Sequence, residues 1–96
     1  MARVVYSSNA LDDLARAFEF LAREDPRAAA GAAAAIRDAV SALERHPLIG
    51  RPLDEGLREL VISYGKTGYV ALYRFLPRRD EARVLALRHQ RELDYP

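Results

Sequence analysis

The stretch that decides the fold is residues 68–92, GYVALYRFLPRRDEARVLALRHQRE. It holds two runs rich in aliphatic and aromatic residues, Tyr69–Leu76 and Ala82–His89, on either side of the sequence Pro77-Arg78-Arg79-Asp80. Runs of this composition favour extended backbone, and a polar tetrapeptide that begins with proline favours a turn. The sequence therefore predicts two adjacent antiparallel strands joined by a short loop.

The length of this loop decides which residues face each other across the two strands. If the loop has four residues, the expected pairs are Leu76 with Glu81, Tyr73 with Val84, Ala71 with Ala86 and Tyr69 with Arg88. One face then carries tyrosine, alanine and arginine, while the other carries aliphatic residues: Val70, Leu72, Leu85 and Leu87, with Leu60 and Ile62 from the preceding strand. We expect the aliphatic face to be buried and the tyrosine face to be half open, although a slip of one residue would exchange them.

The rest of the chain predicts a strand at Arg3–Tyr6, helices at about Ala10–Arg23 and Pro26–Arg45, and a strand at Arg58–Ser63. Residues 46–52, HPLIGRP, contain two prolines and a glycine, which end the second helix and form an ordered connector. The expected order is β-α-α-β-β-β. We therefore predict an α+β fold in which a helical hairpin packs on one face of a small, mainly antiparallel sheet.

The composition excludes several classes of protein. A length of 96 residues predicts one domain, residues 1–96, and a hydrophobic fraction of 50% is typical of a globular chain. There is no cysteine, hence no disulfide framework, and no run of about 18 apolar residues that would span a membrane. Two histidines far apart and two glycines in a hairpin turn predict neither a metal site nor a phosphate loop. We expect a cytoplasmic protein without cofactors.

The net charge of +1 conceals an asymmetry along the chain. Residues 9–25 hold five acidic residues and two arginines, whereas residues 74–91 hold six arginines and two acidic residues. A basic C-terminal half indicates an anionic partner, either a nucleic acid or an acidic protein surface. The alternative is a charged strand edge that prevents aggregation.

His89 is the main candidate for proton-transfer chemistry. RNA cleavage through the 2′-hydroxyl needs a base, an acid and a cation, and Arg74, Arg88 or Arg91 can supply the cation. A second proton-transfer group is not obvious in the sequence, and Glu59, Glu92 and Tyr95 are weak candidates. The alternative is that His89 only packs locally at the end of its strand.

The tyrosines and arginines of the two strands are also candidates for binding a partner. Tyr69 and Tyr73 can stack on bases or anchor a peptide, beside Arg74, Arg88 and Arg91. Strand alternation places Arg88 with the two tyrosines and His89 with the aliphatic face, which weakens a joint catalytic pair. We therefore interpret the segment Arg88–Glu92 as part of a docking surface for a partner and not primarily as an active site. Ordinary strand composition is the alternative for the tyrosines.

Several motifs in order resemble the RelE/ParE superfamily of bacterial toxins. They are VVYSSNALDDLARAFEFLA near the start, the connector HPLIGRP, the strands RELVI and GYVALYRF, and the ending VLALRHQRE. The resemblance covers nearly the whole chain. It implies the toxin of a type II toxin–antitoxin operon, neutralised by an antitoxin whose N-terminal domain binds DNA. Operator DNA would be contacted mainly through that antitoxin.

The superfamily has two activities, and the resemblance is stronger to the ParE-like subgroup, which poisons DNA gyrase. This chain has a single lysine, Lys66, in a turn, and its long helical hairpin and GRP connector resemble that subgroup. The alternative is a RelE-like, ribosome-dependent mRNA endoribonuclease that uses Arg74, Arg88, His89 and Tyr95. A third possibility is an inactive module that only binds an antitoxin.

Overall fold

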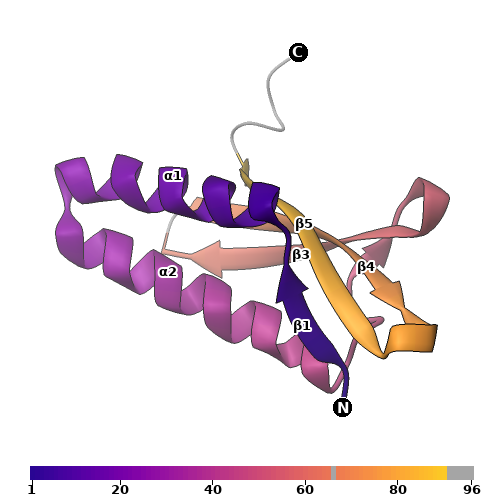
Figure 1. Cartoon of the computed structure of the whole chain (residues 1–96). Helices are drawn as coiled ribbons and strands as arrows, with labels where there is room; N and C mark the ends of the chain where they lie inside the picture. Colours follow the sequence, from indigo (N-terminus) through magenta and orange to yellow (C-terminus); the bar gives the residue numbers. More distant parts are fainter. Residues whose placement is uncertain (66, 91–96) are drawn as a thin grey trace.

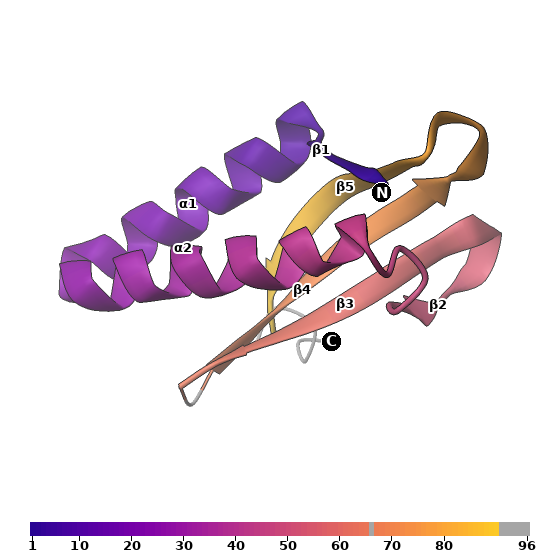
Figure 2. The ribbon, with the colours of Figure 1, turned by 90° about the horizontal axis from the view of Figure 1, so that it is seen from below.

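The computed structural model describes residues 1–65 and 67–90, and it confirms the predicted fold class. Two helices lie side by side across one face of a sheet whose strands are ordered β1-β5-β4-β3-β2 (Figures 1 and 2). The first strand runs parallel to β5, and the other neighbours are antiparallel. The helices and strands are β1 Arg3–Tyr6, α1 Ser8–Glu24, α2 Pro26–Ser41, β2 Arg51–Pro52, β3 Leu57–Tyr64, β4 Thr67–Leu76 and β5 Glu81–His89. Short 3-10 turns follow α2, β2 and β4 at Ala42–Glu44, Asp54–Gly56 and Pro77–Arg79.

The helical hairpin is closed by a single residue, Asp25. Its side chain accepts hydrogen bonds from the backbone N–H groups of Arg27 and Ala28, which caps the start of α2 ahead of Pro26. Its own backbone N–H donates to Leu21, which ends α1. One residue therefore serves both helix ends, and the two helices must run antiparallel as the sequence predicted.

The predicted register is confirmed in the first half of the β4–β5 pair and is wrong in the second half. Leu76 lies opposite Glu81 and Tyr73 opposite Val84, but a bulge then adds Leu85 to β5. Beyond the bulge Tyr69 lies opposite His89 and not opposite Arg88. A bulge places two residues of one strand against one of its partner, so every later pair shifts by one.

The predicted assignment of the two faces is also wrong. Tyr69 and Tyr73 are 2% and 0% exposed and form the core beneath the helices, together with Ala71 between them. Val70 and Leu72, which were expected there, lie on the opposite face because side chains alternate along the strand. Of the expected aliphatic set, Leu87 and Ile62 belong to the core that the helices cover.

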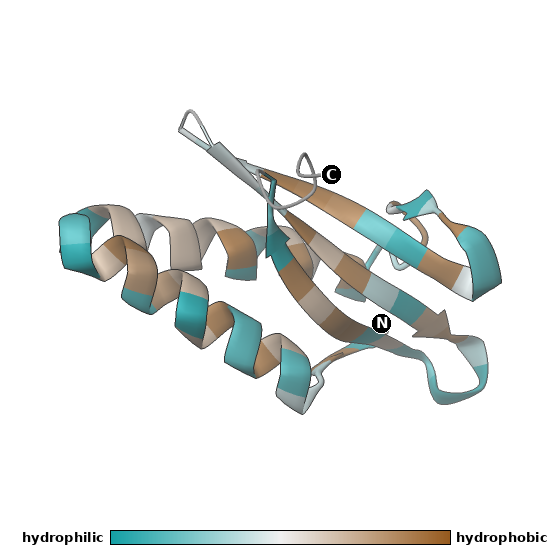
Figure 3. Ribbon diagram, turned by 90° about the horizontal axis from the view of Figure 1, so that it is seen from above, coloured by the Kyte–Doolittle hydropathy of each residue, from teal (hydrophilic) through white to brown (hydrophobic). Residues whose placement is uncertain are grey.

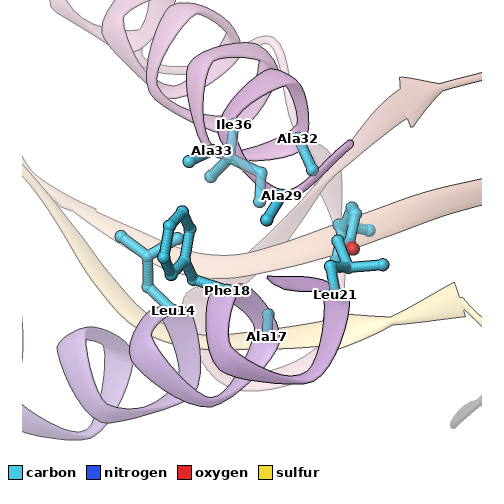
Figure 4. Close-up of a pocket in the computed structure, with 9 residues that line it drawn as sticks. Leu14, Ala17, Phe18, Leu21, Ala29, Ala32, Ala33 and Ile36 are labelled. Carbon is cyan, nitrogen blue, oxygen red and sulfur yellow. The ribbon is translucent and has the colours of Figure 1, made fainter. Parts of the chain in front are cut away.

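The packing of the hairpin explains why large tyrosine rings lie under the helices. Small residues of α2 and the apolar stripe of α1 face each other (Figure 4), and Tyr69 of β4 lines the space between them. The cavity that they leave has about 10 Å³, room for no more than about one water molecule. Alanines on the helix let it approach closely, and the tyrosines fill the remaining depth. Figure 3 shows the complementary pattern, with hydrophilic residues in the turns between β2 and β3 and between β4 and β5.

The connector between α2 and β3 is held by the hydroxyl group of Tyr73. This hydroxyl donates to the carbonyl of Pro47 at 2.8 Å and accepts from the N–H of Gly50 at 2.9 Å. A Cβ atom at Gly50 would lie 2.5 Å from the tyrosine ring, so the close approach requires glycine. Arg58 donates to the carbonyls of Leu48 and Gly50 and fixes the other side of the loop.

The N-terminal part of α1 completes the edge of β5. Since β1 pairs only with residues 81–84, the later part of β5 turns its outer edge toward the helix. The backbone of Ser7 donates to Val84, and the side chains of Ser7 and Asn9 both donate to the carbonyl of Leu85 at 3.1 Å. The Leu87 N–H donates to the carboxylate of Asp13 at 2.9 Å. Side chains of a helix thus replace a neighbouring strand.

Asp13 is a buried carboxylate with three donors. Its side chain is 2% exposed and accepts from the guanidinium groups of Arg16 and Arg88, the latter at 2.7 Å, besides the Leu87 N–H. Burial of a charge is costly unless the charge is paired and hydrogen-bonded, and here all three donors meet that need. The cluster joins α1 to the end of β5.

We predict that Tyr73→Phe destabilises the fold by about 2–3 kcal/mol, because it leaves the buried Gly50 N–H and Pro47 carbonyl without their partner. Urea unfolding measures the change. The matched control is Tyr64→Phe at a partly exposed tyrosine of β3, which should change the free energy of unfolding by about 0.5 kcal/mol or less. Equal losses in both variants would show that the Tyr73 hydroxyl does not hold the connector.

We predict that Asp13→Asn lowers the free energy of unfolding by about 2–3 kcal/mol, since it removes the charge that pairs with two arginines. The adjacent Asp12→Asn, at an exposed position, is the control and should be neutral within about 0.5 kcal/mol. Thermal or urea unfolding of both variants checks this. If the two variants are equally stable, the carboxylate does not stabilise the α1–β5 junction.

Candidate partner-binding groove

Arg88 is held in place by the protein itself. Besides its bond to Asp13, it donates to the carbonyl of Leu87 at 3.2 Å, and its side chain is 37% exposed. Strand pairing places Arg88 opposite Val70 and not with the tyrosines, which corrects the sequence-based placement. Its guanidinium group reaches round the edge of β5 to the helix. Arg88 is therefore first of all the counter-ion of a buried carboxylate.

His89 lies at the end of β5 on the side that the helices cover, together with Leu87. Its Nε2 atom is hydrogen-bonded to the hydroxyl of Thr67, and its ring meets Tyr69 edge to face, with centroids 5.2 Å apart. Both contacts fix the orientation of the imidazole ring. Burial raises the pKa of the Tyr69 hydroxyl, and neighbouring Tyr64 adds to this effect.

Arg74 lies at the opposite end of the same strand pair. It faces Arg83 across the ladder, and it donates to the carbonyl of Glu55. Arg74 lies five positions along β4 from Tyr69, the residue opposite His89, which corresponds to roughly 16 Å at about 3.3 Å per residue. The structure therefore does not bring Arg74 together with Arg88 and His89. Tyr95 and Arg91, the remaining candidates, lie outside the described residues.

The two tyrosines that were expected to form a half-open binding surface are buried in the core. Of the expected partner-binding residues within the described ranges, Arg74 and Arg88 keep partly exposed side chains. Tyr69 reaches a surface only at the floor of a groove described below.

A groove of about 980 Å³ lies between α1 and the ends of β4 and β5. Figure 1 shows that α1 continues well past the end of β5, and residues from both halves of the helix line the groove. The groove is lined by both apolar and charged side chains, among them Asp13, Arg16, Phe20, Tyr69, Leu87 and Arg88.

Sequence reasoning missed Asp13, Arg16 and Phe20 as members of this site. One signal was present, because Asp13 falls at helical spacing among Ala10, Leu14 and other residues of the buried stripe of α1. A carboxylate in an apolar stripe indicates a buried partner. The sequence did not identify that partner, since Arg88 lies 75 positions away.

Two classes of site find no support in the described part of the chain. No group of three or more histidine, cysteine or acidic side chains there is placed to hold a metal ion. None of the helices in the same residues is long and apolar enough to cross a membrane.

Comparison with known families and sequences gives a consistent result. Residues 4–94 match the family described as the ParE toxin of the type II toxin–antitoxin system, parDE. The chain is 33% identical over 92 residues to Toxin RelE3 of Caulobacter vibrioides, which covers 96% of this chain and 98% of that protein. It is 36% identical over 73 residues to Toxin RelE1 of the same organism, covering 76% and 78% of the two chains.

Solved structures agree on the fold. A chain of the chromosomal ParDE system from P. aeruginosa has a TM-score of 0.76 at 22% identity and covers 93% of this chain and 96% of its own. A chain of the RelBE2 toxin–antitoxin complex from Mycobacterium tuberculosis has a TM-score of 0.62 at 26% identity and covers 93% and 91%. The arrangement of two helices on a mixed five-stranded sheet and the match of nearly the whole sequence lead to one conclusion: this chain belongs to the ParE toxin family of the RelE/ParE superfamily of type II toxin–antitoxin systems.

Proposed function

We propose that this chain is a ParE-like toxin that acts in the cytoplasm by contact with DNA gyrase and is neutralised by a cognate antitoxin. The observation that carries the proposal is the separation of the cations that RNA cleavage would need. Arg88 pairs with Asp13 at one end of the β4–β5 ladder, and Arg74 lies at the other. Within residues 1–65 and 67–90 the candidate catalytic residues do not converge on one point, and a toxin that lacks such a constellation is expected to act by binding its target.

The chemical requirement makes the separation informative. Cleavage through the 2′-hydroxyl needs a base, an acid and a cation around one phosphate, each within hydrogen-bond reach of its atom. Here His89 already contacts Thr67 and Tyr69, and Arg88 is held by its ion pair with the buried carboxylate of Asp13. Arg74, the other candidate cation within the described residues, lies at the far end of the strand pair.

The solved relatives support an antitoxin as the partner. They include the ParDE system of P. aeruginosa and RelBE complexes of E. coli and M. tuberculosis, whose descriptions name toxin–antitoxin assemblies. By analogy, the antitoxin of this chain would carry a DNA-binding N-terminal domain and a C-terminal segment that covers the toxin. Contact with operator DNA would then be made through the antitoxin.

A second candidate is a ribosome-dependent mRNA endoribonuclease of the RelE type. This candidate is supported by the names of the two Caulobacter relatives, RelE3 and RelE1. An inactive module that only binds antitoxin is the third candidate. The three differ in what they do to a growing cell, so one set of expression experiments separates them.

We predict that expression of the chain without antitoxin arrests growth and that the purified toxin inhibits supercoiling by purified gyrase. Co-expression of the antitoxin encoded beside it should restore growth. Normal supercoiling together with codon-linked breaks in mRNA, scored by primer extension, would assign the chain to the endoribonucleases. Unimpeded growth would leave only the inactive binding module.

We predict that His89→Gln retains growth arrest within about threefold, because glutamine keeps a hydrogen-bonding side chain beside Thr67 but cannot exchange protons near neutral pH. A general acid or base typically contributes about 10²–10⁴-fold to a rate, so a ribonuclease would lose nearly all toxicity. Arg74→Gln serves as the parallel test of the distant cation. Dose–response curves of growth against inducer give the measurement, with immunoblots to equalise protein levels.

A further inference from the structure

The outer edge of β3 is paired only at its start. The two-residue strand β2 lies opposite Arg58 and Glu59, and within the described ranges no strand lies beside the rest of that edge. Figure 2 shows the same arrangement, with β4 along one side of β3 and β2 near the start of the other. Residues Leu60–Tyr64 therefore form an open strand edge, which we call the β3 edge.

Every second residue of β3 directs its backbone N–H and carbonyl groups away from β4. Leu57 does so, because its carbonyl accepts a hydrogen bond from the N–H of Leu53 at 2.7 Å. The bonding side alternates from residue to residue in an antiparallel strand, so Glu59, Val61 and Ser63 also face outward. Glu59 meets β2, whereas nothing in residues 1–65 and 67–90 bonds to the outward groups of Val61 and Ser63.

The β3 edge lacks the features by which proteins usually prevent pairing at an edge. These features are charged side chains, prolines, bulges or a very short strand. The other outer strands have them, since β1 has four residues and begins with Arg3, and β2 has two residues and contains Pro52. Residues 60–64, LVISY, have no charge and no proline, and their pairing with β4 is regular. An edge of this composition favours pairing with a further strand.

The β3 edge is also complementary to itself. If two copies pair antiparallel about Ile62, Val61 of each copy lies opposite Ser63 of the other, and the outward groups of each such pair exchange two hydrogen bonds. Leu60 then lies opposite Tyr64 of the second copy. The two Val61 side chains, each 58% exposed in the single chain, become diagonal neighbours on the sheet face that the helices do not cover. No like charges meet in this register.

The surface of α2 is compatible with this pairing. A two-fold axis through Ile62 and perpendicular to the sheet places the helices of both copies on the same face. The helix that lies near the β3 edge is α2, because the Tyr64 hydroxyl occupies the position where a Cβ atom of Gly31 would lie. Residues 28–35 of α2 are all alanine or glycine, so the helices of two copies can approach each other closely.

We propose that the toxin forms a symmetric dimer through the β3 edge, in which the sheets of two copies continue into one. The occupant is a second copy because the edge itself supplies the complementary strand, with the same length and the same spacing of outward groups. The interface is small, so we expect a dissociation constant on the order of 10 µM. This inference does not depend on the target of the toxin.

Sedimentation velocity of the purified toxin between about 1 µM and about 200 µM measures the self-association. The unaltered chain should shift from monomer to dimer over this range. Val61→Lys should weaken association by at least about 10-fold, because it loses the valine contact and brings the lysines of two copies close together. Val61→Thr keeps a β-branched, uncharged side chain and should associate within about threefold of the unaltered chain.

Leu11→Lys is the control of matched exposure, since Leu11 is 53% exposed on α1. It should leave the self-association unchanged within about threefold. Because Leu11 and Val61 are both exposed, the variants are expected to fold, and circular dichroism with urea unfolding checks this.

Disulfide formation tests the register. The chain has no cysteine, so a thiol introduced at one position reports on that position alone. Opposite residues of a hydrogen-bonded pair have Cα atoms about 5.5 Å apart, within the range that a disulfide spans. A mixture of Val61→Cys and Ser63→Cys toxins should form covalent dimers on mild oxidation, mostly between unlike variants. A mixture of Val61→Cys and Leu11→Cys should form mixed dimers at least about 10-fold more slowly.

Three results would overturn the inference. The toxin could sediment as a monomer over the whole concentration range, or as a dimer that Val61→Lys leaves intact. Alternatively, a monomeric toxin could lose affinity for the neighbouring antitoxin through Val61→Lys, which would assign the β3 edge to a strand of the antitoxin. Growth arrest and gyrase inhibition test the proposed function separately, so its failure is distinguishable from each of these results.

Discussion

The architecture depends on a mismatch in length between two neighbouring strands. The first strand has four residues and β5 has nine, so the outer edge of β5 needs other partners beyond Val84. Unpaired backbone groups at an interior position are costly, and the start of α1 supplies Ser7, Asn9 and Asp13 to meet them. This requirement fixes the helix against the strand. It also fixes Arg88, and the groove lies between α1 and the ends of β4 and β5.

The part of the fold that depends on local signals was predictable from the sequence. The cap at Asp25, the order of the elements apart from the two-residue strand β2, and the β4–β5 register as far as Tyr73 follow from neighbouring residues. The assignment of faces was not predictable, because β4 is apolar on both sides and alternation alone does not choose between them. On β4 the tyrosine rings fill the depth that the alanines of α2 leave, and on β5 the bulge at Leu85 brings Leu87 to the same face.

The candidate site shows a similar division. The concentration of arginines near the C-terminus was visible in the sequence, but their partners lie far away along the chain. Glu81 is buried and binds both Arg3 and Arg83, and Asp13 binds Arg88. Part of the basic charge is therefore used inside the protein. The charge count alone overstated the amount of basic charge that is available to a partner. The ion pairs in the structure show which arginines remain exposed.

The parallel pairing of β1 with β5 joins residues 78 positions apart, and β5 lies in the interior of the sheet. During synthesis, the first strand and the helical hairpin leave the ribosome long before their central partner exists. Contacts of such long range form late, since they bear the largest loop-closure entropy. The sheet closes only when almost the whole chain has been made. An incomplete chain cannot form either the groove or the core beneath it. Folding of a toxin with this topology is therefore delayed until its synthesis is almost finished.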